Sequence, residues 1–166
     1  MSSTVIFMCP GFVELNKNLP GMHDLGAWQI DYVARQIVSS MIRGELAPLD
    51  AVLHTSCPGA ADAAEIVVGM HRWKGYKEAG RAVTVREVAD VRTAAELPAH
   101  TVLAIGSKRD VADAVQQLTG RLVDPSDADA IVVQCEGPDF AAVPSGLHPI
   151  KQRYPRDPWP WGAAHA

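Results

Sequence analysis

Five short apolar runs alternate with longer helical stretches along most of this chain. The runs cover residues 5–8, 51–55, 83–85, 101–105 and 130–133. Strands that are apolar throughout are typical of a sheet buried on both faces, and strands that alternate with helices usually run parallel. The pattern therefore predicts an α/β fold of three layers, α/β/α, built around a mostly parallel central sheet.

The stretches between these runs have the spacing of amphipathic helices. Apolar side chains recur every three or four positions in residues 25–41, which indicates a helix there. A second helix is predicted from the turn at Pro58 to about residue 70. A third begins after Gly106 and ends at Gly120, which suits a helix C-cap.

The composition narrows the class of protein further. The chain has 166 residues, of which 48% are apolar and 20% charged, as expected for one globular domain with a full core. A net charge of −4 argues against nucleic acid or an anionic membrane as the main partner. Three cysteines are too few for a secreted disulfide framework. With no apolar run near membrane-spanning length and no basic leader, we expect a cytoplasmic protein without a cofactor.

The last part of the chain differs in character from the rest. We assign residues 1–137 to the α/β domain and residues 138–166 to a tail rich in proline and tryptophan. Proline at this density excludes helix and favours extended structure. The tail either wraps its own domain or docks on another subunit, since Tyr and Trp are favoured interface anchors. The docking candidates are Tyr154, Trp159 and Trp161.

Four motifs follow one another in a recognisable order. They read Cys9-Pro10-Gly11, Met22-His23-Asp24-Leu25-Gly26, Gly59-Ala60-Ala61-Asp62-Ala63-Ala64-Glu65 and Gly106-Ser107. Over residues 4 to about 135 this order resembles the histidine phosphatases, the phosphoglycerate-mutase-like superfamily, in its SixA-type phosphohistidine phosphatase branch. There the corresponding motifs are Arg-His-Gly, Leu-Thr-x-x-Gly, Arg-Ala-x-x-Thr-Ala-Glu and Gly-His. The resemblance implies the phosphoglycerate-mutase-like fold.

The same resemblance implies that the chemistry of the family is absent. In the family the first His attacks phosphorus, while two Arg and a second His hold the phosphoryl oxygens. The resemblance places Pro10 at the nucleophile, Cys9 and Gly59 at the two Arg, and Ser107 at the second His. The nitrogen of Pro10 belongs to a tertiary amide and cannot attack, and the bidentate grip of the guanidinium groups is missing. We therefore expect a catalytically inactive protein that acts as a binding, regulatory or assembly subunit with a protein partner.

The emptied site could still hold an anion. Helix N-termini attract anions through free N–H groups and the helix dipole, and two of them should face the pocket, near Gly59 and Ser107. Ser107, Lys108 and Arg109 are the candidate residues for phosphate or another anion. The alternative is that Lys108 and Arg109 simply point to solvent.

Two enzymatic alternatives stay open. One is a thiol-dependent hydrolase or redox protein that works through Cys9 and Cys57, both of which follow strands. If every strand were parallel, Cys135 would join them in a three-cysteine metal site, but the resemblance implies an antiparallel last strand. The other alternative is residual phosphatase activity on phosphohistidine or phosphomonoesters. Each remaining histidine is expected to be structural rather than a replacement nucleophile.

Overall fold

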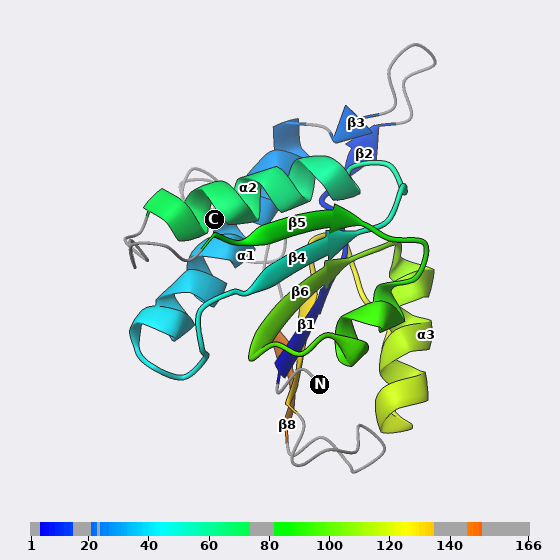
Figure 1. Ribbon diagram of the computed structural model, residues 1–166. Helices are drawn as coiled ribbons and strands as arrows, with labels where there is room; N and C mark the ends of the chain where they lie inside the picture. Colours follow the sequence, from blue (N-terminus) through cyan, green and yellow to red (C-terminus); the bar gives the residue numbers. More distant parts are fainter. Residues whose placement is uncertain (1–3, 15–20, 23, 74–81, 135–145, 151–166) are drawn as a thin grey trace, which may run out of the picture.

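A six-stranded sheet forms the centre of the molecule (Figure 1). The computed structural model of the chain describes residues 4–14, 21–22, 24–73, 82–134 and 146–150. The strand order is β5-β4-β6-β1-β7-β8. The bounds are Thr4–Met8 for β1, Ala51–His54 for β4, Thr84–Glu87 for β5, Thr101–Ile105 for β6, Ala130–Gln134 for β7 and Gly146–Ile150 for β8.

Four neighbouring strands of this sheet, β5, β4, β6 and β1, run parallel. Strand β7 pairs with β1 in the antiparallel direction, and β8 is in turn antiparallel to β7. Two short strands, β2 (Val13–Glu14) and β3 (Gly21–Met22), form a separate antiparallel pair. The prediction of a mostly parallel central sheet is confirmed.

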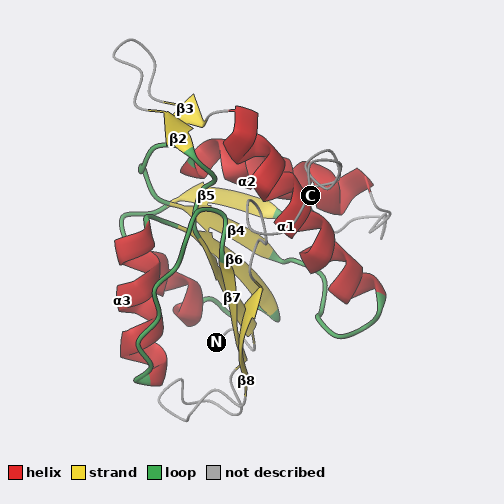
Figure 2. Cartoon of the chain, turned by 180° about the vertical axis from the view of Figure 1, so that it is seen from behind, coloured by secondary structure: helices red, strands yellow, loops and turns green. Residues whose placement is uncertain are grey.

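Helices cover both faces of the sheet, as the two views in Figures 1 and 2 show. On one face lie α1 (Asp24–Ile42) and α2 (Ala60–Trp73), and on the other lie the 3-10 helix η1 (Val91–Glu96) and α3 (Lys108–Thr119). A hydrophobic core lies on each face of the sheet, and successive side chains of β1 point into opposite cores, as in any strand. Ile6 packs with α1 and α2, whereas Phe7 packs with α3 and η1. The three-layer α/β/α architecture is therefore confirmed.

Burial explains where the sequence pattern was most informative. All five residues of β6 are buried, because the strand lies between β4 and β1 and under helices on both faces. Strand β5 is exposed at all four positions because it lies at the edge, and its register follows its pairing with β4, from Ala51–Thr84 to His54–Glu87. The predicted strand 83–85 is thus displaced toward residue 87. Gly120 ends α3 with φ +71, the left-handed C-cap that was predicted.

The described helices include none with both the length and the hydropathy needed to cross a bilayer. Within the proposed tail, residues 146–150 form β8. The docking candidates Tyr154, Trp159 and Trp161 lie outside the described residues.

Candidate binding pocket at the carboxyl edge of the sheet

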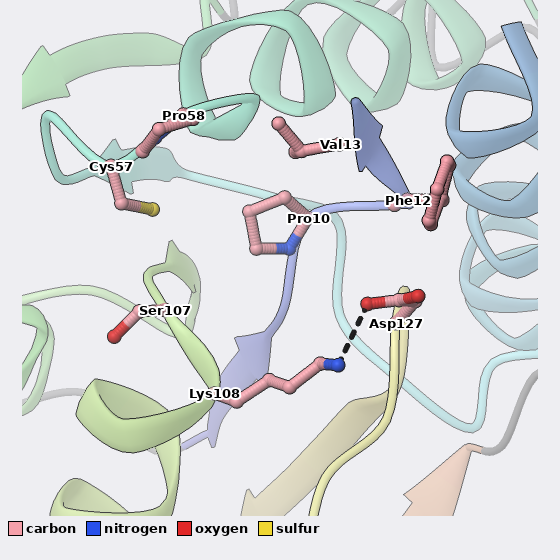
Figure 3. A pocket seen from close by; sticks show the side chains of 9 residues that line it. Pro10, Phe12, Val13, Cys57, Pro58, Ser107, Lys108 and Asp127 are labelled. Atoms are coloured by element: carbon pink, nitrogen blue, oxygen red, sulfur yellow. Dashed lines mark ion pairs between the residues drawn. The ribbon is translucent and has the colours of Figure 1, made fainter. Parts of the chain in front are cut away.

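The carboxyl ends of β1, β4 and β6 meet at one edge of the sheet, because these strands are parallel. Ligand sites of open α/β sheets lie at this edge. A pocket of about 380 Å³ is found there, and Figure 3 shows it from close by. It is lined by Pro10, Gly11, Phe12, Val13, Cys57, Pro58, Ser107, Lys108 and Asp127.

The turn after β1 is held against α1 by its backbone. A Cβ atom on Gly11 would lie 2.1 Å from the carbonyl oxygen of Gly26, so only glycine allows this approach. Next along the chain, the N–H of Phe12 donates to Oε1 of the buried Gln29 at 2.9 Å. These contacts fix the path of the turn without using the side chain of Pro10.

Ser107 is the N-cap of α3, with φ −60 and ψ 163. Its Oγ accepts from the N–H of Asp110 at 3.1 Å, and Oδ2 of Asp110 accepts from the N–H of Ser107 at 3.1 Å. This is a capping box, in which two otherwise free donors of the helix end are satisfied within the chain. The carboxylate of Asp110 also lies where the helix dipole favours negative charge.

Lys108 reaches across the pocket to Asp127, as the dashed line in Figure 3 marks. The distance from Nζ of Lys108 to Oδ1 of Asp127 is 2.9 Å, and this interaction raises the pKa of Lys108 above its ordinary value. Lys108 is the one cation among the described residues that line the pocket. Arg109 is 90% exposed, approaches Asp113 on the same helix at 3.8 Å and is not among the lining residues.

Solved structures with a similar fold include phosphatases and a phosphoglycerate mutase. The histidine phosphatase SixA complexed with tungstate has a TM-score of 0.58 and 14% identity over 79% of this chain and 87% of that chain. A mycobacterial glucosyl-3-phosphoglycerate phosphatase complexed with VO3 has a TM-score of 0.59 and 13% identity over 87% and 97%. The chain has the histidine-phosphatase fold. Phosphoglycerate mutase from Plasmodium falciparum is also similar, with a TM-score of 0.56 and 9% identity over 87% of each chain.

At these identities the likeness shows the histidine-phosphatase fold and does not assign an activity. No protein-family model and no curated protein matches the chain.

Within this histidine-phosphatase fold, the structure brings together some of the predicted site residues and separates others. Pro10, Cys57, Ser107 and Lys108 line the pocket, whereas Cys9 does not. Gly59 stands just before α2 with φ +83 and is not among the described lining residues. The described lining contains neither imidazole nor guanidinium.

The two described cysteines are poor nucleophiles. Cys9 is fully buried in the core beside α3, and burial, followed by the charge of Asp129, raises the pKa of its thiol far above the ordinary range. Cys57 is half-buried and packs against the core of α1 and α2, where burial also raises its pKa, although a hydrogen bond with Thr55 acts in the opposite direction. The raised pKa favours the protonated thiol of both residues near neutral pH. Because the thiolate is the reactive form, neither thiol is suited to act as a nucleophile.

The all-parallel sheet that a three-cysteine site would require is not the sheet of this chain. Strand β7 is antiparallel, so its last residue, Gln134, pairs with Thr4 at the edge opposite the pocket. Cys135, the next residue in the sequence, lies outside the described residues. Within the described part of the chain, no group of three His, Cys, Asp or Glu residues is placed to hold a metal ion.

The histidines that the structure describes include one with a clear structural contact. His71 is 5% exposed, and its Nε2 accepts from the N–H of Leu49 at 3.3 Å. His54 in β4 is half-buried, with Nδ1 3.0 Å from the carbonyl oxygen of Thr55. Neither lines the pocket.

Asp127 is the charged lining residue that the sequence analysis missed, together with the apolar Phe12 and Val13. It lies in the loop before β7, which also contains Asp124 and Asp129. Three acidic residues within six positions, placed just before a buried strand, were the available signal. Their number could have suggested a role at the edge of the sheet, but not that Asp127 faces Lys108.

Proposed function

We propose that this chain is a non-catalytic protein with the histidine-phosphatase fold, and that it serves as a binding, regulatory or assembly subunit. The observation that carries the proposal is the lining of the pocket. Phosphoryl transfer through a protein nucleophile needs a free lone pair and preorganised donors around three oxygens. The described lining offers Pro10 and a capped Ser107, and its one cation, Lys108, is already paired with Asp127.

Two glycines support the resemblance on which this proposal depends. Gly11 and Gly26 correspond to the glycines of the Arg-His-Gly and Leu-Thr-x-x-Gly motifs, and a Cβ on Gly11 would overlap the backbone of Gly26. Positions that the fold needs are therefore kept in this chain. The positions that the reaction needs carry other residues.

The backbone at Gly59 also supports the loss of activity. Its φ of +83 lies in the region that residues with a side chain rarely adopt. An arginine at this position would be strained, so the backbone here does not favour the second Arg of the family.

The raised pKa values of Cys9 and Cys57 argue against a thiol-dependent enzyme. Residual phosphatase activity has one observation in its favour, the fold shared with phosphatases. It is therefore the alternative that the experiment must address.

The direction of β8 supports a partner contact at the pocket edge. Ile150 pairs with Ala130, which pairs with Met8 at the carboxyl end of β1. Strand β8 therefore ends at the edge of the sheet where the pocket opens. Tyr154, Trp159 and Trp161 follow within eleven residues in the sequence, and we propose that they anchor a protein partner. A cytoplasmic location stays a prediction.

Catalysis is tested with a chromogenic phosphate ester and a phosphohistidine peptide at high protein concentration. We expect no turnover above buffer for the full chain. The proposal is overturned by turnover that Lys108→Ala or Ser107→Ala lowers at least tenfold. Arg109→Ala is the matched control, because Arg109 is adjacent in sequence and lies outside the pocket lining.

The subunit role is tested by purifying the full chain from its host and identifying what co-purifies. We expect a stoichiometric protein that is lost when Trp159 and Trp161 are both replaced by alanine. Trp28→Ala is the control, because Trp28 is a half-exposed tryptophan on α1 and does not line this pocket. A lone monomer in every preparation contradicts the role.

A further inference from the structure

We propose that Asp127 is an internal anion that occupies the cationic end of the pocket and makes the pocket reject phosphate and related oxyanions. The inference rests on the proposed function, because it treats the pocket as a binding site. It starts from the 2.9 Å contact between Nζ of Lys108 and Oδ1 of Asp127. An oxyanion that used Lys108 would have to displace this carboxylate or bind beside it against like-charge repulsion.

The loop that carries Asp127 is fixed to the turn after β1. The N–H of Cys9 donates to the carbonyl oxygen of Asp129 at 2.9 Å, and the N–H of Ala128 donates to the carbonyl oxygen of Pro10 at 2.9 Å. Within the loop, Oδ2 of Asp129 accepts from the N–H of Ser126 at 2.8 Å. Ser126 and Ala128, the two residues that flank Asp127, are thus each held by a backbone N–H hydrogen bond.

The conformation of Ala128 is a second sign that the loop is held in place. Ala128 has φ +59, and it is fully buried. A residue with a side chain adopts this left-handed region at a cost and keeps it only where the surroundings impose it. The conformation of the residue after Asp127 is therefore set by packing, which limits how far the backbone at Asp127 can move away from Lys108.

A second positive feature of the pocket, the N-terminus of α3, also has a negatively charged partner within the chain. At the N-terminus of α3, Asp110 supplies a carboxylate that accepts from the N–H of Ser107. Lys108 and the N-terminus of α3 thus both have an acidic partner before any ligand arrives. The rest of the described lining is mainly apolar, with Pro10, Phe12, Val13 and Pro58, which favours an uncharged group over an anion.

The test is to titrate tungstate, and separately inorganic phosphate, into the full chain and into three variants. Binding is measured by isothermal titration calorimetry. Tungstate is a suitable probe because a SixA structure of the same fold contains it. We expect no saturable binding to the wild type up to about 10 mM ligand. Asp127→Asn keeps the shape of the side chain, removes its charge, and should bind tungstate at least roughly tenfold more tightly.

Two further variants make the result specific. In Asp127→Asn/Lys108→Ala the gained binding should disappear, because the released cation is gone. Asp113→Asn removes an acidic residue that pairs with Arg109 on the outer surface of α3, and it should behave as the wild type does. Thermal melts of each variant check that it folds, and Asp127→Ser replaces Asp127→Asn if the latter does not.

Three outcomes overturn the inference: saturable tungstate binding by the wild type that Asp127→Asn does not strengthen, no gain in Asp127→Asn or Asp127→Ser, or a gain that survives Lys108→Ala. Turnover of a phosphate ester would instead overturn the proposed function. Tungstate binding by the wild type that Asp127→Asn does not strengthen, in the absence of turnover, would overturn this inference and leave the proposed function standing.

Discussion

Replacing Gly11 by alanine should destabilise the protein strongly, although it adds a single methyl group. The new Cβ would lie 2.1 Å from the oxygen, 2.5 Å from the carbonyl carbon and 2.5 Å from Cα of Gly26. All three atoms belong to the backbone at the start of α1, so no side-chain rotation relieves the overlap. The turn after β1 and the helix must move apart by about 1 Å to restore ordinary contact.

The cost follows from that displacement. Overpacking of a well-packed interior typically costs 1–3 kcal/mol, and we expect about 3 kcal/mol here because both contacting groups are backbone. For a chain of this size, that corresponds to a fall of roughly 6–12 °C in the melting temperature. Thermal denaturation followed by circular dichroism, together with urea unfolding, measures both quantities.

Gly69→Ala is the matched control. Gly69 lies on the exposed side of α2, and a Cβ there would have nothing within 4 Å. Alanine is favoured over glycine in a helix interior, so this variant should gain up to about 1 kcal/mol. The reasoning is refuted if Gly11→Ala melts within about 2 °C of the wild type.

Three further predictions follow from single groups. Ser107→Ala removes the N-cap of α3 and should lower stability by about 1 kcal/mol in urea unfolding, whereas an unchanged midpoint would contradict the capping role. Thr101→Val removes a buried Oγ1 that has no hydrogen-bond partner in the described part of the chain, and should raise stability by about 1 kcal/mol; a loss would show that the hydroxyl is paired. Because burial raises the pKa of Cys9, the folded state keeps the thiol proton where the unfolded chain loses it. Stability is then complete below the ordinary cysteine pKa of 9.0 and falls as the pH rises above it, by up to about 1.4 kcal/mol per pH unit. Urea unfolding from pH 8 to about 10 should show this slope, and Cys9→Ala should remove much of it; an equal slope in both proteins would refute the assignment.

The sequence predicted the elements whose surroundings are uniform. Strand β6 is buried throughout and apolar after Thr101, because both of its faces are covered. The ends of α3 carry a Ser N-cap and a Gly C-cap that can be recognised locally. Strand β5 was placed less well, because an exposed edge strand takes its bounds from pairing with β4 rather than from its own pattern.

The candidate site was predicted as a set of positions, and its electrostatics were not. Pro10, Cys57, Ser107 and Lys108 do meet at one edge, since they follow or lie near the ends of parallel strands. The pairing of Lys108 with Asp127 joins residues nineteen positions apart on different elements, and no periodicity encodes such a contact. The direction of β7 came from the family resemblance, because an apolar run has the same pattern in either direction.

The shape and the charge of this pocket are set by different parts of the chain. Its shape depends on backbone contacts, such as the N–H of Ala128 to the carbonyl oxygen of Pro10 and the approach of Gly11 to Gly26. None of these contacts uses the side chain at position 10, so a proline can stand there without loss of the fold. The charge depends on Lys108 and Asp127 alone among the described lining residues. A pocket organised in this way can lose a reaction and acquire a new ligand preference while its architecture stays the same, because the residues that decide each property do not overlap.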